Sequence, residues 1–183
     1  MTRVWSIVGE GQVDREFLAR IPIFAGLPPE VLDQFIRAGQ LMEMPAASQL
    51  LAEGDPARSV FVVCDGALEI RKRGASGADI RVAILHAGDC VGEMALIDIQ
   101  PRSATVAALT NARVFRLELS EIGKLHRINN QAYTFLVMNI AREISRRLRL
   151  ADEVLANLGM TAEAMWSDAI GTSTHPAMPA VTD

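Results

Sequence analysis

Short apolar runs alternate with turn-forming residues through the middle of the chain, between positions 41 and 117. Gly, Asp and Pro separate the runs at intervals of about ten residues, and the segment 74–79 is expected to be a hairpin tip. Short strands at such a spacing are typical of an all-β barrel or jelly roll. The expected strands span 59–64, 67–71, 80–85, 105–109 and 113–117.

Helical patterns flank this β region. Asp14 can cap a short helix that runs to position 20, and Pro28 and Pro29 can open a second helix that ends before position 40. After the last expected strand, Ser120 can cap a helix that continues to about position 128. The pattern therefore predicts a mainly β fold with flanking helices.

The longest expected helix follows, because residues 130–158 contain neither Gly nor Pro and Gly159 can end the run. Apolar and small side chains recur along it at alternating spacings of three and four, which is the pattern of a helix-pairing seam. A single helix packed on the barrel is the alternative, but the seam is longer than a small barrel could cover. The seam consists of Thr134, Val137, Ala141, Ile144, Leu148, Ala151, Leu155 and Leu158.

Composition narrows the class of protein. Half of the 183 residues are hydrophobic and 22% are charged, which is typical of a globular protein. The apolar runs are too short for a membrane span or a signal peptide, so a cytoplasmic location is expected. The net charge of −4 argues against a nucleic-acid partner. Cys64 and Cys90 are too few for a disulfide scaffold and are expected to be buried, inert thiols.

One stretch carries candidate chemistry. Residues 92–105 place a carboxylate at Glu93, a one-turn apolar segment after it, and a guanidinium nine residues later at Arg102. A cyclic phosphodiester on a sugar needs such a set, since the phosphate binds a guanidinium and helix-start N–H groups while the hydroxyl binds a carboxylate. The stretch closely resembles the phosphate-binding cassette of cyclic nucleotide-binding domains, the family found in protein kinase A regulatory subunits, cyclic-nucleotide-gated channels and catabolite activator proteins.

The resemblance extends over roughly residues 15–158, because Gly-Asp and Asp-Gly pairs stand where this family has its β-roll turns. It implies an eight-stranded β-roll with N-terminal helices and a long C-terminal helix. Glu93 would accept a hydrogen bond from the ribose 2′-OH, and Arg102 would donate to the cyclic phosphate. The other members of the implied ligand-binding set are Gly92, Met94, Ala95, Ser103 and Ala104, with the backbone N–H groups of Ala95 and Ala104 facing the anion.

Simpler interpretations of the charged residues stay open at this stage. Glu93 could be a surface turn acid, and Arg102 could be a surface arginine paired with an acid such as Asp98. The arginines at 142, 146, 147 and 149 are expected to form a solvated helix face, balanced by the acids at 143, 152 and 153.

The base of the nucleotide is the least determined feature. Residues 145–153 resemble the corresponding helix of the catabolite activator type, and on that register Asp152 falls where an adenine-contacting hydroxyl is usual. A carboxylate at this position could bind adenine or guanine, or could remain solvated. The resemblance favours cAMP over cGMP as the ligand. Trp166 could stack on a purine from outside or face a partner.

The favoured function is a non-enzymatic cyclic-nucleotide receptor that pairs through residues 134–158 and acts on an unknown protein effector, without a cofactor, nucleic acid or membrane. A transcription regulator of the catabolite activator type is the second possibility, although the 24 residues after Gly159 leave little room for a helix-turn-helix. A cupin-like enzyme is the third, but His86, His126 and His175 are too scattered for a metal site. The expected domains are an N-terminal extension (1–13), the nucleotide-binding β-roll with its flanking helices (14–129), the long helix (130–159) and a mostly disordered tail (160–183).

Overall fold

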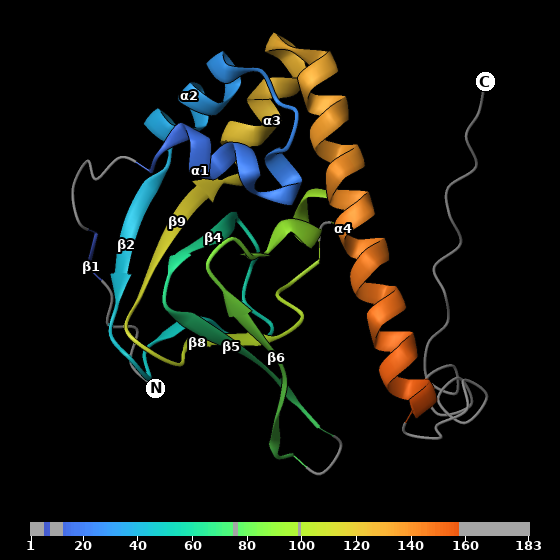
Figure 1. The fold of residues 1–183 in the computed structure, drawn as a ribbon. Helices are drawn as coiled ribbons and strands as arrows, with labels where there is room; N and C mark the ends of the chain where they lie inside the picture. Colours follow the sequence, from blue (N-terminus) through green and yellow to red (C-terminus); the bar gives the residue numbers. More distant parts are fainter. Residues whose placement is uncertain (1–5, 8–12, 75–76, 99, 158–183) are drawn as a thin grey trace. The chain divides into compact units, whose positions relative to one another are not determined.

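A computed structural model describes residues 6–7, 13–74, 77–98 and 100–157. The chain forms two compact units, Met1–Glu143 and Ile144–Asp183. The first contains the β-rich region and the short helices (Figure 1). The second begins within the long C-terminal helix. The predicted disorder of the tail, the helix end at Gly159 and the possible role of Trp166 all lie outside the described residues.

Two antiparallel sheets make up the β region of the first unit. One has the strand order β1-β2-β9-β4-β7 and the other the order β3-β8-β5-β6. Strands β2 to β9 supply the eight strands of the predicted roll, which is therefore confirmed, and β1 adds a two-residue edge beside β2. The strands are β1 Ser6–Ile7, β2 Gln40–Met44, β3 Gln49–Leu51, β4 Ser59–Asp65, β5 Ala67–Arg73, β6 Asp79–His86, β7 Cys90–Val91, β8 Thr105–Ala108 and β9 Ala112–Glu118.

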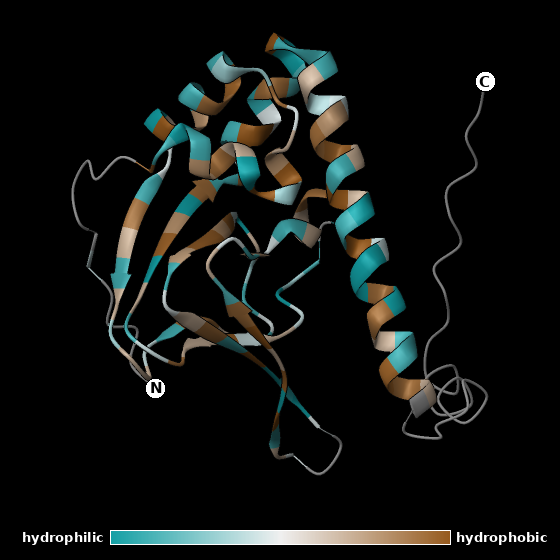
Figure 2. Ribbon diagram, in the orientation of Figure 1, coloured by the Kyte–Doolittle hydropathy of each residue, from teal (hydrophilic) through white to brown (hydrophobic). Residues whose placement is uncertain are grey.

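The core of the roll lies between these sheets. Alternate residues of a strand point to opposite faces, so every second side chain of β2, β4 and β9 faces inward. Met42, Phe61 and Val114 are buried there and pack with Leu68 and Val106 of the other sheet. In Figure 2 the strands of the roll change colour repeatedly between hydrophobic and hydrophilic residues. Burial of this apolar surface is the main favourable contribution to the fold.

The short helices are α1 (Arg15–Arg20), the 3-10 helix η1 (Pro22–Phe24), α2 (Pro29–Ala38) and α3 (Leu119–Ile128). The predicted cap of α1 is confirmed, because the Asp14 side chain accepts a hydrogen bond from the Glu16 N–H. Phe24 and Phe35 bring η1 and α2 together, with ring centroids 5.8 Å apart. The predicted cap of α3 is wrong, because Glu118 occupies the N-cap position and Ser120 lies inside the first turn.

The long helix α4 spans Asn130–Asn157 and confirms the predicted uninterrupted run over the described residues. Two faces of it differ. Ala132, Leu136 and Ile140 are buried within the first unit, while the Asn139 amide donates to the Ala25 carbonyl at 2.8 Å. The side chains of the predicted seam lie on another face, where Thr134, Ala141, Leu148 and Ala151 are exposed. The seam residue Leu158 lies outside the described residues.

One charged residue of α4 departs from expectation. Glu143 is buried, so it does not belong to the solvated face that was predicted for its neighbours. No helix in the described part of the chain has the length and apolar character needed to span a membrane.

Candidate ligand-binding site

The cassette begins at Gly92, which has a left-handed backbone with a φ of 89°. Glycine reaches this conformation without the steric cost that a side chain would add. The space around it also excludes a side chain, because a Cβ would collide with the Arg102 guanidinium and with the Ser59 carbonyl. The one-turn 3-10 helix η2 (Glu93–Leu96) follows directly. Gly92 therefore allows the guanidinium to lie against the start of this turn.

Glu93 is buried, with only 1% of its surface exposed. The interpretation as a surface turn acid is therefore wrong. Burying a carboxylate is costly unless hydrogen bonds or an opposite charge compensate it, and the charge of Glu93 interacts favourably with that of Arg102. The structure thus brings together the carboxylate and the guanidinium that the sequence singled out.

Arg102 is also buried, with 7% of its surface exposed. Its Nη2 donates to the Ser59 carbonyl at 2.6 Å and its Nη1 makes a longer contact of 3.4 Å with the Gly92 carbonyl. The guanidinium carbon lies 5.9 Å from the centre of the Phe61 ring. The alternative pairing with Asp98 is therefore wrong, because neutral carbonyl groups hold the guanidinium.

The backbone of Arg102 is fixed on both sides. Its N–H donates to the Asp55 carbonyl at 2.8 Å, and its own carbonyl accepts from the Gly54 N–H at 2.9 Å. These two bonds anchor the end of the cassette to the loop before β4. The side chain therefore leaves from a rigid point, which is what a preorganised anion site needs.

One donor of Arg102 is left over. The Nε atom is buried and has no hydrogen-bond partner among the described residues. Burial lowers the pKa of the guanidinium, while the carboxylates of Glu93 and Asp55 raise it. An arginine stays charged at physiological pH in spite of such shifts. A charged, desolvated group with an unused donor is chemically suited to an oxyanion.

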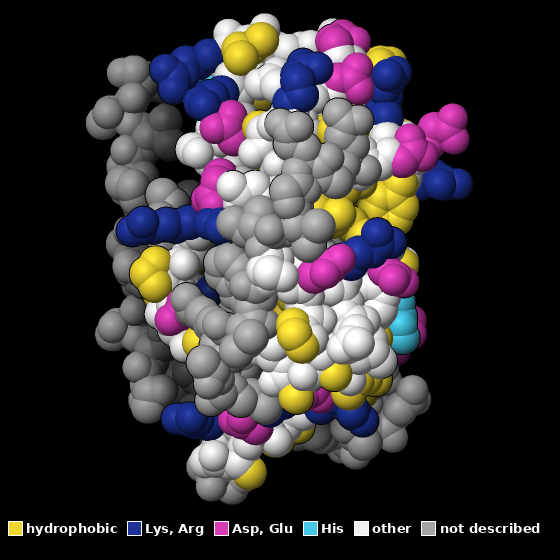
Figure 3. All heavy atoms as spheres, turned by 90° about the vertical axis from the view of Figure 1, so that its left-hand side faces the viewer, with side chains coloured by type: hydrophobic (Ala, Val, Ile, Leu, Met, Phe, Trp, Pro, Cys, Tyr) yellow, Lys and Arg dark blue, Asp and Glu magenta, His cyan; other side chains and the backbone are white. Residues whose placement is uncertain are grey.

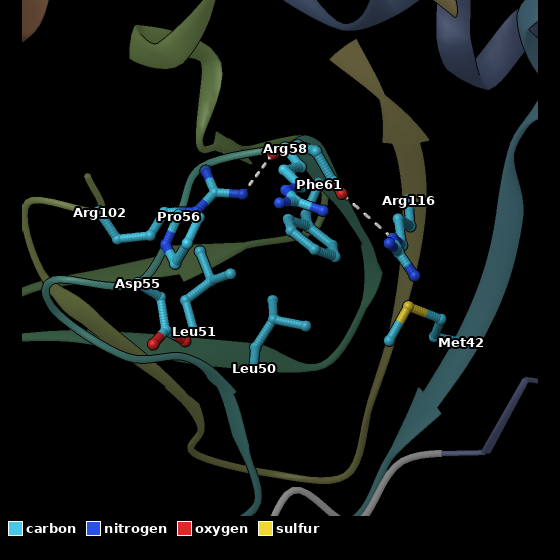
Figure 4. A pocket seen from close by; sticks show the side chains of 10 residues that line it. Met42, Leu50, Leu51, Asp55, Pro56, Arg58, Phe61, Arg102 and Arg116 are labelled. Atoms are coloured by element: carbon cyan, nitrogen blue, oxygen red, sulfur yellow. Dashed lines mark hydrogen bonds between the residues drawn. The ribbon is translucent and has the colours of Figure 1, made fainter. Parts of the chain in front are cut away.

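A cavity of about 310 Å³ lies beside Arg102 (Figure 4). Arg58, Arg102 and Arg116 line it together with Asp55, and the three arginine side chains are drawn around Phe61. The remaining lining residues are Met42, Leu50, Leu51, Pro56 and Ser59. The sequence did not single out Arg58, Ser59 or Arg116, although Arg116 stands between the apolar residues Phe115 and Leu117 of β9.

The other predicted site residues lie within the cassette but differ in exposure. Ala95 and Ala104 are half-buried, whereas Met94 is 45% exposed and Ser103 is exposed. Asp152 lies on α4 in the second unit and is exposed. Its contribution to base recognition stays a prediction.

Neither cysteine is among the residues that line this cavity. Cys90 is buried, and burial raises the pKa of the Cys64 thiol to about 11, so Cys64 is neutral at physiological pH. A neutral thiol is a poor nucleophile. Within the described ranges, no three His, Cys, Asp or Glu side chains are grouped as a metal site would require.

Comparison with known proteins shows which family the chain resembles. Residues 41–129 match the model of the cyclic nucleotide-binding domain family. The chain is 27% identical over 150 residues to a CRP-like cAMP-activated global transcriptional regulator of Mycobacterium tuberculosis, covering 80% of this chain and 63% of that protein. It is 33% identical over 101 residues to a cAMP-dependent protein kinase regulatory subunit of Aspergillus niger, covering 55% of this chain and 24% of the subunit. The chain thus spans less than two thirds of either relative.

The fold is shared with solved structures. A cyclic nucleotide-binding domain from Methylobacillus flagellatus superposes with a TM-score of 0.72 at 22% identity, covering 84% of this chain and 89% of that one. The arrangement of two sheets, N-terminal helices and a long C-terminal helix is therefore that of this fold.

Proposed function

Residues 41–129 form a cyclic nucleotide-binding domain related to CRP-type regulators and protein kinase A regulatory subunits, and we propose that this chain is a receptor for a cyclic mononucleotide. We propose cAMP as the preferred ligand over cGMP. The Mycobacterium tuberculosis regulator is named as cAMP-activated and the Aspergillus niger subunit as belonging to a cAMP-dependent kinase, which supports this preference.

The buried, unpartnered Nε of Arg102 is the observation that carries the proposal. Nη2 of the guanidinium already donates to the Ser59 carbonyl, so Nε and the weakly bonded Nη1 are the donors available to a ligand. A cyclic phosphate presents two exocyclic oxygens, and a guanidinium can donate to both in parallel. Filling the site would satisfy the orphaned donor and neutralise the buried charge.

Glu93 supplies the second half of the recognition. A carboxylate only accepts hydrogen bonds, so it selects a ligand with a free hydroxyl beside the phosphate. The ribose 2′-OH of a cyclic nucleotide is such a group. Glu93 and Arg102 are both buried on the same cassette, which supports their acting on one ligand.

We propose that the response to ligand binding is a rearrangement of α4 and not a chemical reaction. The chain would act without enzymatic activity, as a cytoplasmic homodimer paired along the seam of residues 134–158, and would pass the signal to a protein partner. The exposure of Thr134, Ala141, Leu148 and Ala151 supports this pairing, because these side chains are available to a second copy.

A transcription regulator of the Crp/Fnr type that lacks or borrows its DNA-binding domain is the alternative. The similarity to the Mycobacterium tuberculosis regulator favours it. The charge of the chain speaks against direct DNA binding, because the net charge is −4. Basic and acidic side chains are also interspersed on the face shown in Figure 3. Binding to duplex DNA that declines steeply with added salt would support this alternative.

The ribose contact is tested with Glu93→Ala and two ligands, cAMP and 2′-deoxy-cAMP. Wild-type protein should prefer the ribose ligand, and Glu93→Ala should lose about 1–2 kcal/mol of cAMP affinity together with most of that preference. Asp98→Ala, an exposed acid of the same cassette, is the matched control. Equal discrimination between the two ligands by Glu93→Ala and wild type, measured by calorimetry, would exclude this role.

A further inference from the structure

Four inward-facing residues meet where β4 and β9 pair. Ser59 stands opposite Glu118, and Phe61 stands opposite Arg116. Residues two apart on a strand share a face, so all four side chains face the inside of the roll. Three of them, Ser59, Phe61 and Arg116, line the cavity beside Arg102 (Figure 4).

Three of these side chains form a closed polar cluster. The Ser59 hydroxyl donates to Glu118 Oε1 at 3.1 Å and accepts from Arg116 Nε at 3.2 Å. Arg116 Nη2 also forms an ion pair with the same carboxylate oxygen. A hydroxyl has one proton to donate, and here the cluster fixes where it points. Ser59 is only 4% exposed, so water competes little for these bonds.

The same serine holds Arg102. Its carbonyl accepts the shortest hydrogen bond of that guanidinium, at 2.6 Å. Ser59 therefore binds Arg102 through its backbone and the Arg116–Glu118 pair through its side chain. Any shift of the carbonyl toward or away from Arg102 changes the geometry of the hydroxyl as well, because both belong to one residue.

The cluster also reaches the start of α3. Glu118 stands at the N-cap position of this helix, although its side chain makes no capping hydrogen bond and is held by Ser59 and Arg116 instead. The next residue, Leu119, donates its N–H to the Arg58 carbonyl at 2.9 Å. Arg58 and Ser59, which are neighbours in the chain, therefore bind Leu119 and Glu118 at the start of the helix. The backbone of Glu118 runs directly into the first turn, so a movement of its carboxylate with Ser59 and Arg116 acts on the residue at which the helix begins.

We propose that Ser59, Arg116 and Glu118 are positioning residues that hold Arg102 for an anionic ligand and couple occupation of the site to the first turn of α3. The coupling to a ligand rests on the proposed function, because it requires the phosphate to bind Arg102. A phosphate that accepts hydrogen bonds from Nε and Nη1 reorients the guanidinium. The hydrogen bond from Arg102 Nη2 to the Ser59 carbonyl is then strengthened or weakened. The Ser59 hydroxyl passes this change to Glu118. Coupling of this kind is reciprocal, so a disturbed cluster also weakens ligand binding.

The test compares two buried serines of the same roll. Ser59→Ala removes the hydroxyl but keeps the carbonyl that binds Arg102. Ser48→Ala is the matched control, because Ser48 is 5% exposed and its hydroxyl donates to the Pro45 carbonyl, away from the cavity. Ser59→Ala should weaken cAMP binding about fivefold to tenfold and remove the cAMP-dependent change in amide hydrogen exchange at the first turn of α3. Ser48→Ala should change neither.

A ligand-free measurement separates this inference from the proposed function. Arg102→Lys should alter amide exchange or chemical shifts at Leu119 and Ser120 in otherwise wild-type protein, and the effect should fall at least threefold when Ser59→Ala is also present. Arg113→Lys, an exposed arginine of β9, should leave these amides unchanged. If Ser59→Ala leaves the effect of Arg102→Lys intact, or behaves like Ser48→Ala toward cAMP, the cluster does not couple the two places. If the wild type fails to bind cAMP but the ligand-free coupling is observed, the proposed ligand is wrong and the coupling through Ser59, Arg116 and Glu118 is retained.

Discussion

Single residues of the cassette show most clearly what a sequence can predict. Glu93 and Arg102 are recognisable because both belong to one short stretch, where spacing along the chain nearly fixes spacing in space. Arg58, Ser59 and Arg116 were not recognised as neighbours of Arg102. They come from three other places in the chain, namely the loop before β4, β4 itself and β9, respectively. Only the register Ser59↔Glu118 and Phe61↔Arg116 brings them to the site. Register depends on the whole sheet and is not encoded in any local motif.

At this scale, Arg102→Ala tests the anion site. The substitution removes the buried cation and its unpartnered Nε donor, so cyclic nucleotide affinity should fall by about 3 kcal/mol, roughly a hundredfold or more. Arg113→Ala removes an arginine that is half exposed and should leave affinity unchanged. Calorimetry on both variants, after a denaturation curve shows that each is folded, makes the comparison. Equal affinities for the two variants would contradict the assignment.

The elements were predicted unevenly. The five strand runs and the long helix follow the expected positions closely, because each has a strong period of its own. The strands β2, β3 and β7 and the 3-10 helix η1 were not predicted as separate elements, since each is only two to five residues long. The one-turn segment expected at the cassette is present as η2. The cap of α3 was misplaced because the β9 strand runs directly into the helix, which leaves Glu118 at the junction in place of a Ser or Asp cap.

Helix α4 carries a prediction about assembly. Leu148 is 61% exposed and lies at the centre of the seam, so Leu148→Lys would bury a charge in a paired interface and should give monomers. Leu150→Lys is the matched control, because Leu150 is 54% exposed but lies off the seam. Light scattering at tens of micromolar protein should give the wild type and Leu150→Lys about twice the chain mass of 19.9 kDa. A wild-type mass near that of one chain would rule out the dimer.

The same helix carries a prediction about the base. If the Asp152 carboxylate reads the purine, Asp152→Ala should change the ratio of cAMP to cGMP affinity by several-fold, which is about 1 kcal/mol. Glu153→Ala removes the adjacent exposed acid and should leave the ratio as it is. Competition binding with the two nucleotides measures the ratio. An unchanged ratio in Asp152→Ala would mean that Asp152 does not read the base.

At the scale of the whole molecule, three features stand out: the acidic composition, the family match and the division into two compact units. The chain is acidic overall, with 22 acidic against 18 basic residues, and residues 41–129 match the cyclic nucleotide-binding domain family. The two compact units divide at Glu143, within α4, so the helix belongs to both. Because α4 runs from the first unit into the second, we propose that it carries the ligand-driven change.

The most direct test is a calorimetric titration of the wild-type chain, stripped of any nucleotide carried through purification, with cAMP and with cGMP. A receptor built around the unpartnered Arg102 donor should bind cAMP with one site per chain and bind cGMP more weakly. A cyclic mononucleotide binding heat that is lost in Arg102→Ala would place the ligand at the cassette. Absence of both heat and thermal shift with either nucleotide at millimolar concentration would contradict the proposed function.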